Sequence, residues 1–475
     1  MRGKTQWNER PHLHPFEDPD AVYICRLAPS ESSLTVEWTD AKQEGGYRFQ
    51  WRPMFTGDPW CEQATDDTEI TLQGLTTWRD YEVRVARKNG ECTPSRYVRI
   101  APVPGTVINY LHPQDDRYAF SGKTICSPNL IRLPSGKLLA SMDTYVHGGQ
   151  QNLGFLFESD DRGETWHYVC DLFPLMWGKM FLHRGRLYML GCSTEFGDVI
   201  IGASDDEGHT WTAPVHLFCG GNTAGDGFSQ SPMPVIRHKG RLYVSMEYSG
   251  RNVGFRPTVL SIREDADLLD PANWHCTKPV LIDPDQFHLP GVRIEDLLEG
   301  NLYIDPAGEL CCMLRVDGWG FDMADGKAAV LKVPTEDPDA PMEFSHFASM
   351  PAGYHSKFML QYDDVSGYYI AIGNLPTQTI CDKQRNVLGL LYSKDSDHWT
   401  VACRILDSAI EQRWEVGYQY PSFVFDGDDI LLQVRTATNG ARNFHDANYE
   451  TFHIIRDFRR LLKPDEGPSQ ERGEA

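Results

Sequence analysis

The clearest structural signal in the sequence is the stretch Asn129–Ala140, which reads NLIRLPSGKLLA. An apolar run leads into a tight turn at Gly136 and a second apolar run follows, which is the pattern of a β-hairpin. The same pattern recurs with turns at five further glycines: Gly185, Gly240, Gly308, Gly367 and Gly427. Successive turns are 49, 55, 68, 59 and 60 residues apart, which leaves room for two more strands after each hairpin. This spacing is typical of four-stranded propeller blades, so the sequence predicts six blades.

A second repeat, out of phase with the hairpins, marks further tight turns. Residues 159–166 (SDDRGETW) and 204–211 (SDDEGHTW) share the pattern S-x-D-x-G-x-T-W at a spacing of 45, and residues 393–399 (SKDSDHW) are a decayed copy. Asp and Gly stabilise such a turn, and the Trp is expected to pack into the blade. These motifs are Asp boxes, and with the six hairpins they make the chain resemble the sialidase (neuraminidase) superfamily of six-bladed β-propellers. The motif indicates a fold rather than an activity, because other propellers share it.

The first hundred residues form a separate unit, with strand-like runs at 34–38, 47–51, 69–72 and 81–86. The segment LTTWRDYEV at 75–83 resembles the tyrosine corner of a fibronectin type III sandwich, and Trp38 matches the core Trp of its second strand. We therefore predict an all-β chain: a fibronectin type III-like domain over residues 20–102, a Pro- and Gly-rich linker, and the propeller over residues 106–463. Such an N-terminal module is usually a spacer or a docking platform.

The composition bears on partners and location. The 475 residues carry 45 Lys and Arg against 67 Asp and Glu, a net charge of -22, so neither nucleic acid nor an anionic membrane is expected as the main partner. The sequence contains no run of about 18 apolar residues, so no transmembrane helix is predicted. The first twenty residues lack the apolar core of a secretory signal, so a cytoplasmic location is expected. The twelve scattered cysteines are expected to be reduced and mostly buried.

Polar residues recur at one offset from the hairpin glycines. Because blades are related by rotation, such residues are expected at one height around the central channel. Seven or eight places after the glycine, at the end of an apolar strand, the six repeats carry Asp143, Ser193, Glu247, Arg315, Asn374 and Arg435. We interpret them as a polar ring at one mouth of the channel. The alternative is that strand ends are simply where solvent begins.

A carboxylate and a phenol are expected at the start of the innermost strands. Nine places before the glycine, four repeats carry Ser127, Ser231, Glu299 and Tyr418. A carboxylate can take the proton of a neighbouring phenol, whose free pKa is about 10, and so make an oxygen nucleophile. Sialidases use a Tyr nucleophile activated by Glu, so the resemblance implies catalytic roles for Glu299 and Tyr418. Tyr420 is the alternative nucleophile if the last hairpin is shifted.

The resemblance also implies how an acidic sugar would be held. Residues 299–310 together with Arg315 are similar to the sialidase stretch that supplies the activating Glu and a carboxylate-binding Arg. Arg385 precedes the decayed Asp box, where another Arg of the family's triad is expected. Guanidinium groups suit a carboxylate because they bind it through two hydrogen bonds and stay charged. The structural alternatives are an Arg paired with one of the many acids and a Tyr packed inside a blade.

The sequence departs from the family pattern in two places. Where the family has an R-I-P segment, residues 126–128 read CSP, so the first carboxylate-binding Arg is missing. Where the acid/base Asp is expected, residues 148–152 read GGQQN, and neither Gln nor Asn donates a proton as a general acid. Asp143 or His147 is the predicted substitute. A histidine in general suits acid/base work near neutral pH, but a solvated loop histidine is the alternative for His147.

A dense polar segment, residues 435–449, joins two strands of the last blade. Its Arg442, His445 and Asp446 are predicted to close over the pocket and supply the missing cation or acid, with a polar connecting loop as the alternative. His445 and Asp446 have no third ligand at metal spacing, so no metal and no other cofactor is predicted. The full set of predicted substrate-binding residues is Arg315, Arg385, Arg435, Arg442, Glu247, Asn374 and His445.

The sequence thus predicts a sialidase-like, exo-acting glycoside hydrolase that removes a terminal, acidic sugar from a glycan. Two other functions stay open. In a polysaccharide lyase, a Tyr or His would remove the proton next to a uronate carboxylate held by the same Arg pair, leaving a product that absorbs in the ultraviolet. In a non-catalytic carbohydrate-binding propeller, loss of Glu299 would leave binding unchanged.

Overall fold

The computed structural model describes residues 6–8, 22–40, 45–147, 149–283, 285–320, 326–377, 383–410 and 413–462. Regular structure in these ranges is β-strand apart from three short 3-10 helices, η1 (Gln6–Asn8), η2 (Pro271–Asn273) and η3 (Phe458–Leu461). The all-β prediction is therefore confirmed. None of the helices in these ranges has the length and apolar character to span a membrane. The predicted outer limits of the two domains, residues 20 and 463, and Gly148 of the segment 148–152 lie outside the described residues.

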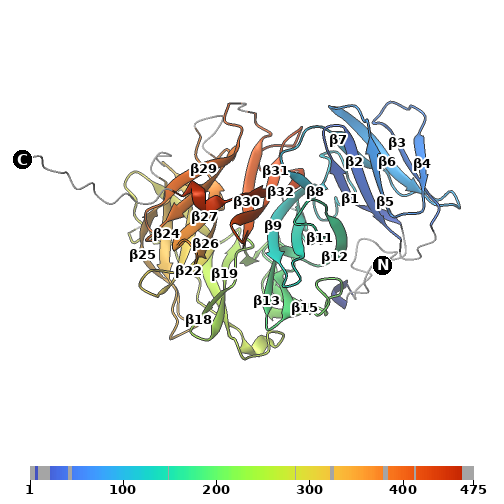
Figure 1. Cartoon of the computed structure of the whole chain (residues 1–475). Helices are drawn as coiled ribbons and strands as arrows, with labels where there is room; N and C mark the ends of the chain where they lie inside the picture. Colours follow the sequence, from blue (N-terminus) through green and yellow to red (C-terminus); the bar gives the residue numbers. More distant parts are fainter. Residues whose placement is uncertain are drawn as a thin grey trace, which may run out of the picture.

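The N-terminal unit is a sandwich of two antiparallel sheets, drawn in blue in Figure 1. One sheet consists of β1 (Tyr23–Pro29), β2 (Ser33–Thr39) and β5 (Glu69–Gln73); the other consists of β4 (Cys61–Thr65), β3 (Tyr47–Pro53), β6 (Arg79–Ala86) and β7 (Arg96–Ile100). Both sheets contribute to one core that includes Trp38 and Phe49. The Tyr81 hydroxyl accepts a hydrogen bond from the Thr76 N–H at 3.0 Å, which confirms the predicted tyrosine corner.

Six antiparallel sheets follow along the chain. Sheet 1 consists of β9 (Thr124–Arg132), β10 (Leu138–Tyr145), β11 (Gly154–Ser159) and β12 (His167–Leu172). Sheet 2 consists of β13 (Met176–His183), β14 (Arg186–Cys192), β15 (Val199–Ser204) and β16 (Val215–Phe218). Sheet 3 consists of β17 (Asp226–Ser229), β18 (Ile236–His238), β19 (Arg241–Gly250), β20 (Gly254–Arg263) and β21 (His275–Cys276); β17 and β18 both pair with β19.

The remaining three sheets have four strands each. Sheet 4 consists of β22 (Arg293–Ile304), β23 (Leu310–Trp319), β24 (Lys327–Lys332) and β25 (Glu343–Ser349). Sheet 5 consists of β26 (Met359–Asp363), β27 (Tyr368–Asn374), β28 (Val387–Ser393) and β29 (Thr400–Asp407). Sheet 6 consists of β30 (Gly417–Asp426), β31 (Asp429–Ala437), β32 (Tyr449–Ile455) and, from the start of the propeller, β8 (Thr106–Tyr110).

The predicted hairpin glycines lie where the sequence places them. Each joins the innermost strand of its sheet to the next strand, and each has a positive φ, between 64° and 96°. A residue with a Cβ is strained in that conformation, which is why glycine marks the turn in every repeat. The hairpin signal therefore identified all six sheets from the sequence.

Hydrophobic clusters join the six sheets into a ring. Each of six clusters combines residues of two neighbouring sheets, and one of them packs Leu431 and Phe452 of sheet 6 against Leu138 and Phe157 of sheet 1. Strand β8 pairs with β32, so the start of the propeller completes its last sheet. These contacts confirm the predicted six-bladed β-propeller.

The repeated turn motif is held by its own side chains. The Ser159 hydroxyl donates to Asp161 Oδ1 at 2.8 Å and accepts from the Gly163 N–H at 2.8 Å, while the Thr165 N–H donates to Asp161 at 2.9 Å. The copies at 204–211 and 393–399 also contain the Ser-to-Asp hydrogen bond. Their Trp rings are buried, as predicted: Trp166, Trp211 and Trp399. Burial of a large ring contributes about 2 kcal/mol or more to blade packing.

The sandwich is docked against the propeller. Arg26 donates to the Ile108 carbonyl at 2.8 Å, and Arg96 forms a buried ion pair with Asp115. In Figure 1 strands β1 and β7 lie next to β8 and β32, and Val107, Tyr110 and Tyr449 belong to the sandwich core. At the same junction Glu37, Glu69 and His167 bring their ligand atoms within 4.8 Å of one another. His167 Nδ1 of the propeller lies 3.3 Å from Glu69 Oε2 of the sandwich, and Arg26 of the sandwich approaches the same oxygen at 4.0 Å.

Candidate functional site

Bulges in the innermost strands change the direction of side chains near the candidate site. Five of the six sheets have a non-glycine residue with φ between 53° and 57° near the start of the inner strand: Ser127, Trp177, Glu299, His355 and Tyr420. At four of them the pairing register with the next strand shifts. A bulge re-aims a side chain and is enriched next to functional sites. Here it brings Glu299 and Tyr420 to one group of arginines.

Glu299 and Arg315, which the sequence assigns to one site, form a buried ion pair. Arg315 Nη1 donates to Glu299 Oε2 at 2.6 Å, and Arg315 Nη2 donates to Asp317 Oδ2 at 2.9 Å. The Glu299 N–H donates to Glu247 Oε1 at 2.6 Å. Burial raises the pKa of Asp317, but hydrogen bonds from His355, Arg315 and Lys383 outweigh it and hold that pKa well below its usual range. The strained backbone of Glu299 is therefore fixed on one side by Glu247 and its carboxylate on the other by Arg315.

Tyr420 is the tyrosine that meets this group. The guanidinium carbons of Arg435 and Arg385 lie 5.0 Å and 5.4 Å from the centre of its ring. Burial raises the pKa of the Tyr420 hydroxyl and the Glu299 carboxylate raises it further, while Arg385, Arg315 and Arg435 oppose the rise. One carboxylate and three guanidinium groups thus act on a single phenol.

Arg315, Arg385 and Arg435 each have one N–H group without a hydrogen-bond acceptor among the described residues. Arg385 donates to Gln419 Oε1 at 2.5 Å and to the His355 carbonyl at 2.8 Å, and Arg435 donates to the His445 carbonyl. The Nε–H groups of Arg315, Arg385 and Arg435 are buried, and none of the three has a hydrogen-bond partner among the described residues. An unpaired buried donor costs about 1–3 kcal/mol, so three of them around one phenol favour binding of an anionic acceptor.

Of the two tyrosines predicted as the nucleophile, Tyr420, the alternative, lies beside the arginines, and Tyr418 lies elsewhere. Tyr418 packs in the apolar cluster between sheets 5 and 6, and its hydroxyl shares a hydrogen bond with Ser408 at 2.9 Å. Two tyrosines two places apart in a regular strand would share a face. The bulge between Gln419 and Ser422 breaks this alternation, and Tyr420 has a φ of 53°. Counting nine residues back from the hairpin glycine does not reach Tyr420, because the turn between β30 and β31 is shorter than the turn between β22 and β23.

Two predicted binding residues are placed elsewhere. The Asn374 side chain supports the backbone: its Nδ2 donates to the Tyr418 carbonyl at 2.6 Å and to those of Arg385 and Val387, and its Oδ1 accepts from Ser356. Its amide is fully used, so it positions strands instead of facing a ligand. Arg442 is 65% exposed, lies 3.7 Å from Asp446 and lines a separate small pocket with Lys123.

Asp143 is deeply buried at the end of β10. Its Oδ1 accepts from the Cys126 thiol at 2.6 Å and its Oδ2 accepts from the Trp177 N–H at 2.5 Å. Burial raises its pKa to about 7, with the thiol, the Trp177 N–H and Arg435 opposing the rise. His147, the other predicted proton donor, is exposed on the loop that follows β10. Asp143 therefore has the pKa of an acid catalyst, but both of its oxygens are occupied inside the protein.

The polar loop of the last sheet lies over Arg435. The His445 ring packs edge-on against Tyr145 with ring centres 5.4 Å apart, and its Nδ1 lies 2.9 Å from Asp446 Oδ1. Burial and the nearby Arg435 together lower the pKa of His445 to about 3, although Asp446 opposes the fall. The predicted site residue His445 is thus brought to the site, where it is a neutral imidazole at neutral pH.

Charged groups continue beneath the site into the propeller. Lys357 is fully buried and donates to the carbonyls of Pro232 at 3.2 Å and Pro421 at 3.0 Å. Burial lowers the pKa of Lys179 and of Lys357 to about 7 each. Burial raises the pKa of Glu247 to about 7 and that of Glu450 to about 8. Nothing in the sequence around Lys179 and Lys357 distinguishes them from surface lysines.

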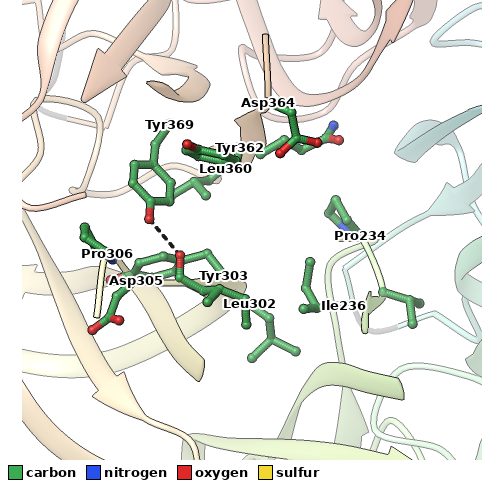
Figure 2. Close-up of a pocket in the computed structure, with 13 residues that line it drawn as sticks. Pro234, Ile236, Leu302, Tyr303, Asp305, Pro306, Leu360, Tyr362, Asp364 and Tyr369 are labelled. Carbon is green, nitrogen blue, oxygen red and sulfur yellow. Dashed lines mark hydrogen bonds between the residues drawn. The ribbon is translucent and has the colours of Figure 1, made fainter. Parts of the chain in front are cut away.

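A larger pocket lies at the hairpin ends of sheets 3, 4 and 5, away from Glu299. It has a volume of about 560 Å³ and is lined by Ile236, Leu302, Tyr362 and Tyr369. Figure 2 shows these side chains, with the Tyr369 hydroxyl bonded to the Ile304 carbonyl at 2.7 Å. The pocket is mostly apolar, and the charged groups described above lie at the other end of the inner strands.

Comparisons with known proteins bear on the two domains separately. Residues 23–100 match the fibronectin type III domain, so the predicted N-terminal sandwich belongs to that type. No curated protein gives a significant match to the chain.

Solved structures resemble the chain in fold. The GH93 alpha-L-arabinofuranosidase of Fusarium graminearum in complex with arabinobiose has a TM-score of 0.51 and 14% identity, covering 76% of this chain and 99% of that one. Hadza microbial sialidase Hz136 has a TM-score of 0.49 and 13% identity, and the match covers 93% of this chain and 96% of that one. Trypanosoma rangeli sialidase in complex with the inhibitor DANA has a TM-score of 0.48 and 13% identity, and the match covers 79% of this chain and 58% of that one. The first of these similarities shows a shared fold.

Proposed function

We propose that the chain is an exo-acting glycoside hydrolase that removes a terminal acidic sugar from a glycan, with Tyr420 as the nucleophile. One observation carries the proposal: Tyr420, Glu299 and three arginines with buried, unpaired Nε–H groups meet at one end of the inner strands. The phenol, the carboxylate and the cations each have a role in this chemistry.

Glu299 is the group that activates Tyr420. Arg315 binds Glu299 Oε2, which leaves Oε1 to accept the phenol proton as the Tyr420 oxygen attacks the anomeric carbon. Burial holds the pKa of Tyr420 above its ordinary value, so the hydroxyl does not ionise on its own at neutral pH and needs this base. The bulges at Glu299 and Tyr420 fix both groups before the substrate arrives.

The arginines define the sugar class. Arg315, Arg385 and Arg435 come from sheets 4, 5 and 6 and act on one phenol, so a carboxylate beside the anomeric carbon would accept their Nε–H groups. A phenol is neutral until it reacts, and it therefore approaches such a carboxylate with less repulsion than Asp or Glu would. Arg435 takes the place of the cation that is missing at residues 126–128.

The test is turnover of a panel of aryl glycosides: sialosides, uronides, rhamnosides and arabinofuranosides. The arabinofuranosides are included because the Fusarium graminearum enzyme of similar fold is an arabinofuranosidase. We expect the wild type to release the aryl group from an acidic sugar. Glu299→Gln and Tyr420→Phe should each lower kcat by about 10³-fold or more, because the base or the nucleophile is lost.

Tyr418→Phe is the matched control, since it removes a hydroxyl two residues away. It should keep kcat within about threefold and lose about 1 kcal/mol of stability with the Ser408 hydrogen bond. Equal losses in the two Tyr variants would contradict the assignment of Tyr420. A product that absorbs in the ultraviolet would identify a lyase instead. Binding of acidic sugars without any turnover would identify a carbohydrate-binding propeller.

A further inference from the structure

Hydrolysis at this site needs a proton donor for the leaving oxygen, and the groups predicted from the sequence do not supply one. Both oxygens of Asp143 are occupied by Cys126 and Trp177. The lowered pKa of His445, about 3, leaves it without a proton to give at neutral pH. His147 is exposed on its loop.

A carboxyl group from sheet 2 reaches the same mouth. Glu195 lies in the loop between β14 and β15 and is partly buried. Its Oε2 accepts a hydrogen bond from Gln151 Nε2 at 3.1 Å, and the same amide donates to the Val146 carbonyl at 2.9 Å. Thr194 donates to the Gln150 carbonyl, so the two loops are joined at two neighbouring positions. Gln151 is fully buried, and it fixes one oxygen of Glu195.

Tyr145 connects Glu195 to the rest of the site. The Tyr145 ring lies 5.8 Å from the guanidinium carbon of Arg435 and 5.4 Å from the centre of the His445 ring. Burial raises the pKa of Tyr145, Arg435 opposes the rise and Glu195 adds to it, so Tyr145 lies within electrostatic reach of both groups. Arg435 in turn lies over the Tyr420 ring. Glu195 therefore approaches the site from sheet 2, whereas Glu299 and Tyr420 come from sheets 4 and 6.

We propose that Glu195 is the acid/base residue of the hydrolysis, held in place by Gln151. This role rests on the proposed function. In the first step the Tyr420 oxygen bonds to the anomeric carbon, its proton passes to Glu299, and the bond to the leaving oxygen breaks as Glu195 gives that oxygen its proton. In the second step water attacks the anomeric carbon and gives a proton to Glu195, while the bond to Tyr420 breaks and Glu299 returns the phenol proton.

The surroundings of Glu195 suit a group that alternates between two protonation states. Burial raises its pKa, while His147, Arg251 and the Gln151 amide oppose the rise. A raised pKa keeps the carboxyl protonated closer to neutral pH, as a general acid requires. Partial exposure leaves it open to a substrate and to water, in contrast to Asp143.

Asp296 supplies a matched control. It is a partly buried carboxyl group of sheet 4 whose pKa is also raised by burial, and its Oδ1 accepts from the Phe255 N–H at 3.0 Å. It lies opposite Asp317 in the β22–β23 ladder. Asp296→Asn therefore removes a similar carboxyl group from sheet 4 instead of sheet 2.

The experiment compares Glu195→Gln, Glu195→Ala and Asp296→Asn on two glycosides of the sugar that the wild type cleaves, one with an activated aryl leaving group and one with an alkyl leaving group. Loss of a general acid should lower turnover of the alkyl glycoside by about 10³-fold in Glu195→Gln. The step that releases the activated aryl group needs no protonation and should be much less affected. Azide should restore turnover in Glu195→Ala, and the basic limb of the wild-type pH profile should disappear in Glu195→Gln.

The outcomes separate this role from the proposed function. If the wild type cleaves a glycoside but Glu195→Gln keeps its rate on the alkyl glycoside, the role of Glu195 is overturned and the hydrolase stands. The same holds if the dependence on leaving group arises in Asp296→Asn. If the wild type cleaves no glycoside, both proposals are overturned. Sugar binding by Glu195→Gln, measured by calorimetry, shows that the variant is folded.

Discussion

Glu450 is a carboxyl group in a place where charge is costly. It is fully buried in β32, its Oε2 accepts from Gln433 at 3.3 Å, and its Oε1 has no hydrogen-bond partner among the described residues. Burial raises its pKa from 4.5 to about 8, with Arg435 opposing the rise. The folded protein therefore holds this proton at pH values where the unfolded chain has released it.

This shift predicts a pH dependence of stability. Because the pKa of Glu450 is higher in the folded state, its contribution to stability is fully present below about pH 4.5 and is lost as the pH rises towards about 8. The slope is at most about 1.4 kcal/mol per pH unit. In Glu450→Gln we expect the fall in unfolding free energy between about pH 5 and about pH 8 to be smaller than in the wild type, as measured by urea denaturation. The exposed Glu31→Gln should follow the wild-type curve, and equal slopes in all three proteins would contradict the prediction.

At the scale of the element, the repeated turns between the outer strands are held by a single aspartate each. Asp161 accepts from the Ser159 hydroxyl and from the N–H and hydroxyl of Thr165. The preceding Asp160 is 74% exposed, and Lys137 Nζ lies 3.8 Å from its Oδ1. Two adjacent acids of one motif therefore have very different surroundings.

Substitution of these two acids tests what holds the turn. Asp161→Ala removes three hydrogen bonds and should lower the unfolding free energy by about 2 kcal/mol. Asp160→Ala should change it by less than about 0.5 kcal/mol. Thermal and urea unfolding of both variants provide the measurement. A similar loss in the two variants would mean that the motif's charge, and not its hydrogen bonds, stabilises the turn.

The same elements show what could be predicted from the sequence. Hairpin glycines and the spacing between them identified the six sheets, because a positive φ leaves a residue signature. Counting from the glycine also found Glu299, Arg315 and Arg435. Counting nine places back from Gly427 predicted Tyr418 and left Tyr420 as the alternative, because the sequence shows neither the shorter last hairpin nor the bulge in β30. It missed Glu195, because the Gln151–Glu195 contact joins loops of two sheets.

At the scale of the whole molecule, the sandwich supports the loop that covers the site. Arg99 of β7 is fixed by Asp80 at 2.6 Å and donates to the Asn439 carbonyl at 3.1 Å, and Asn439 Nδ2 donates to the Pro102 carbonyl at 2.8 Å. Asn439 begins the segment that carries His445, whose carbonyl binds Arg435. The N-terminal domain is thus connected by a short series of hydrogen bonds to the loop that carries His445.

Limited proteolysis tests this support. Arg442 is 65% exposed in the same loop and is a trypsin site. Arg99→Ala removes the hydrogen bond to Asn439, so the loop should open more often and cleavage after Arg442 should become about tenfold faster, which corresponds to about 1.4 kcal/mol. Arg84→Ala is the control, because Arg84 contacts Gln50 and Trp60 within the sandwich. Equal cleavage rates in both variants would show that the sandwich does not stabilise the loop.

The pairing of β8 with β32 has a consequence for biosynthesis. The sandwich and β8 leave the ribosome long before the residues that cover them, because Arg99 and Asn439 are 340 positions apart. At ~5–20 residues per second this separation amounts to about 17–70 s of translation. During that time the apolar faces of Val107 and Tyr110 lack Tyr449. The nascent chain is therefore expected to recruit a chaperone at β8 until the last blade emerges, and ribosome-bound chains stalled before and after β32 would differ in that recruitment.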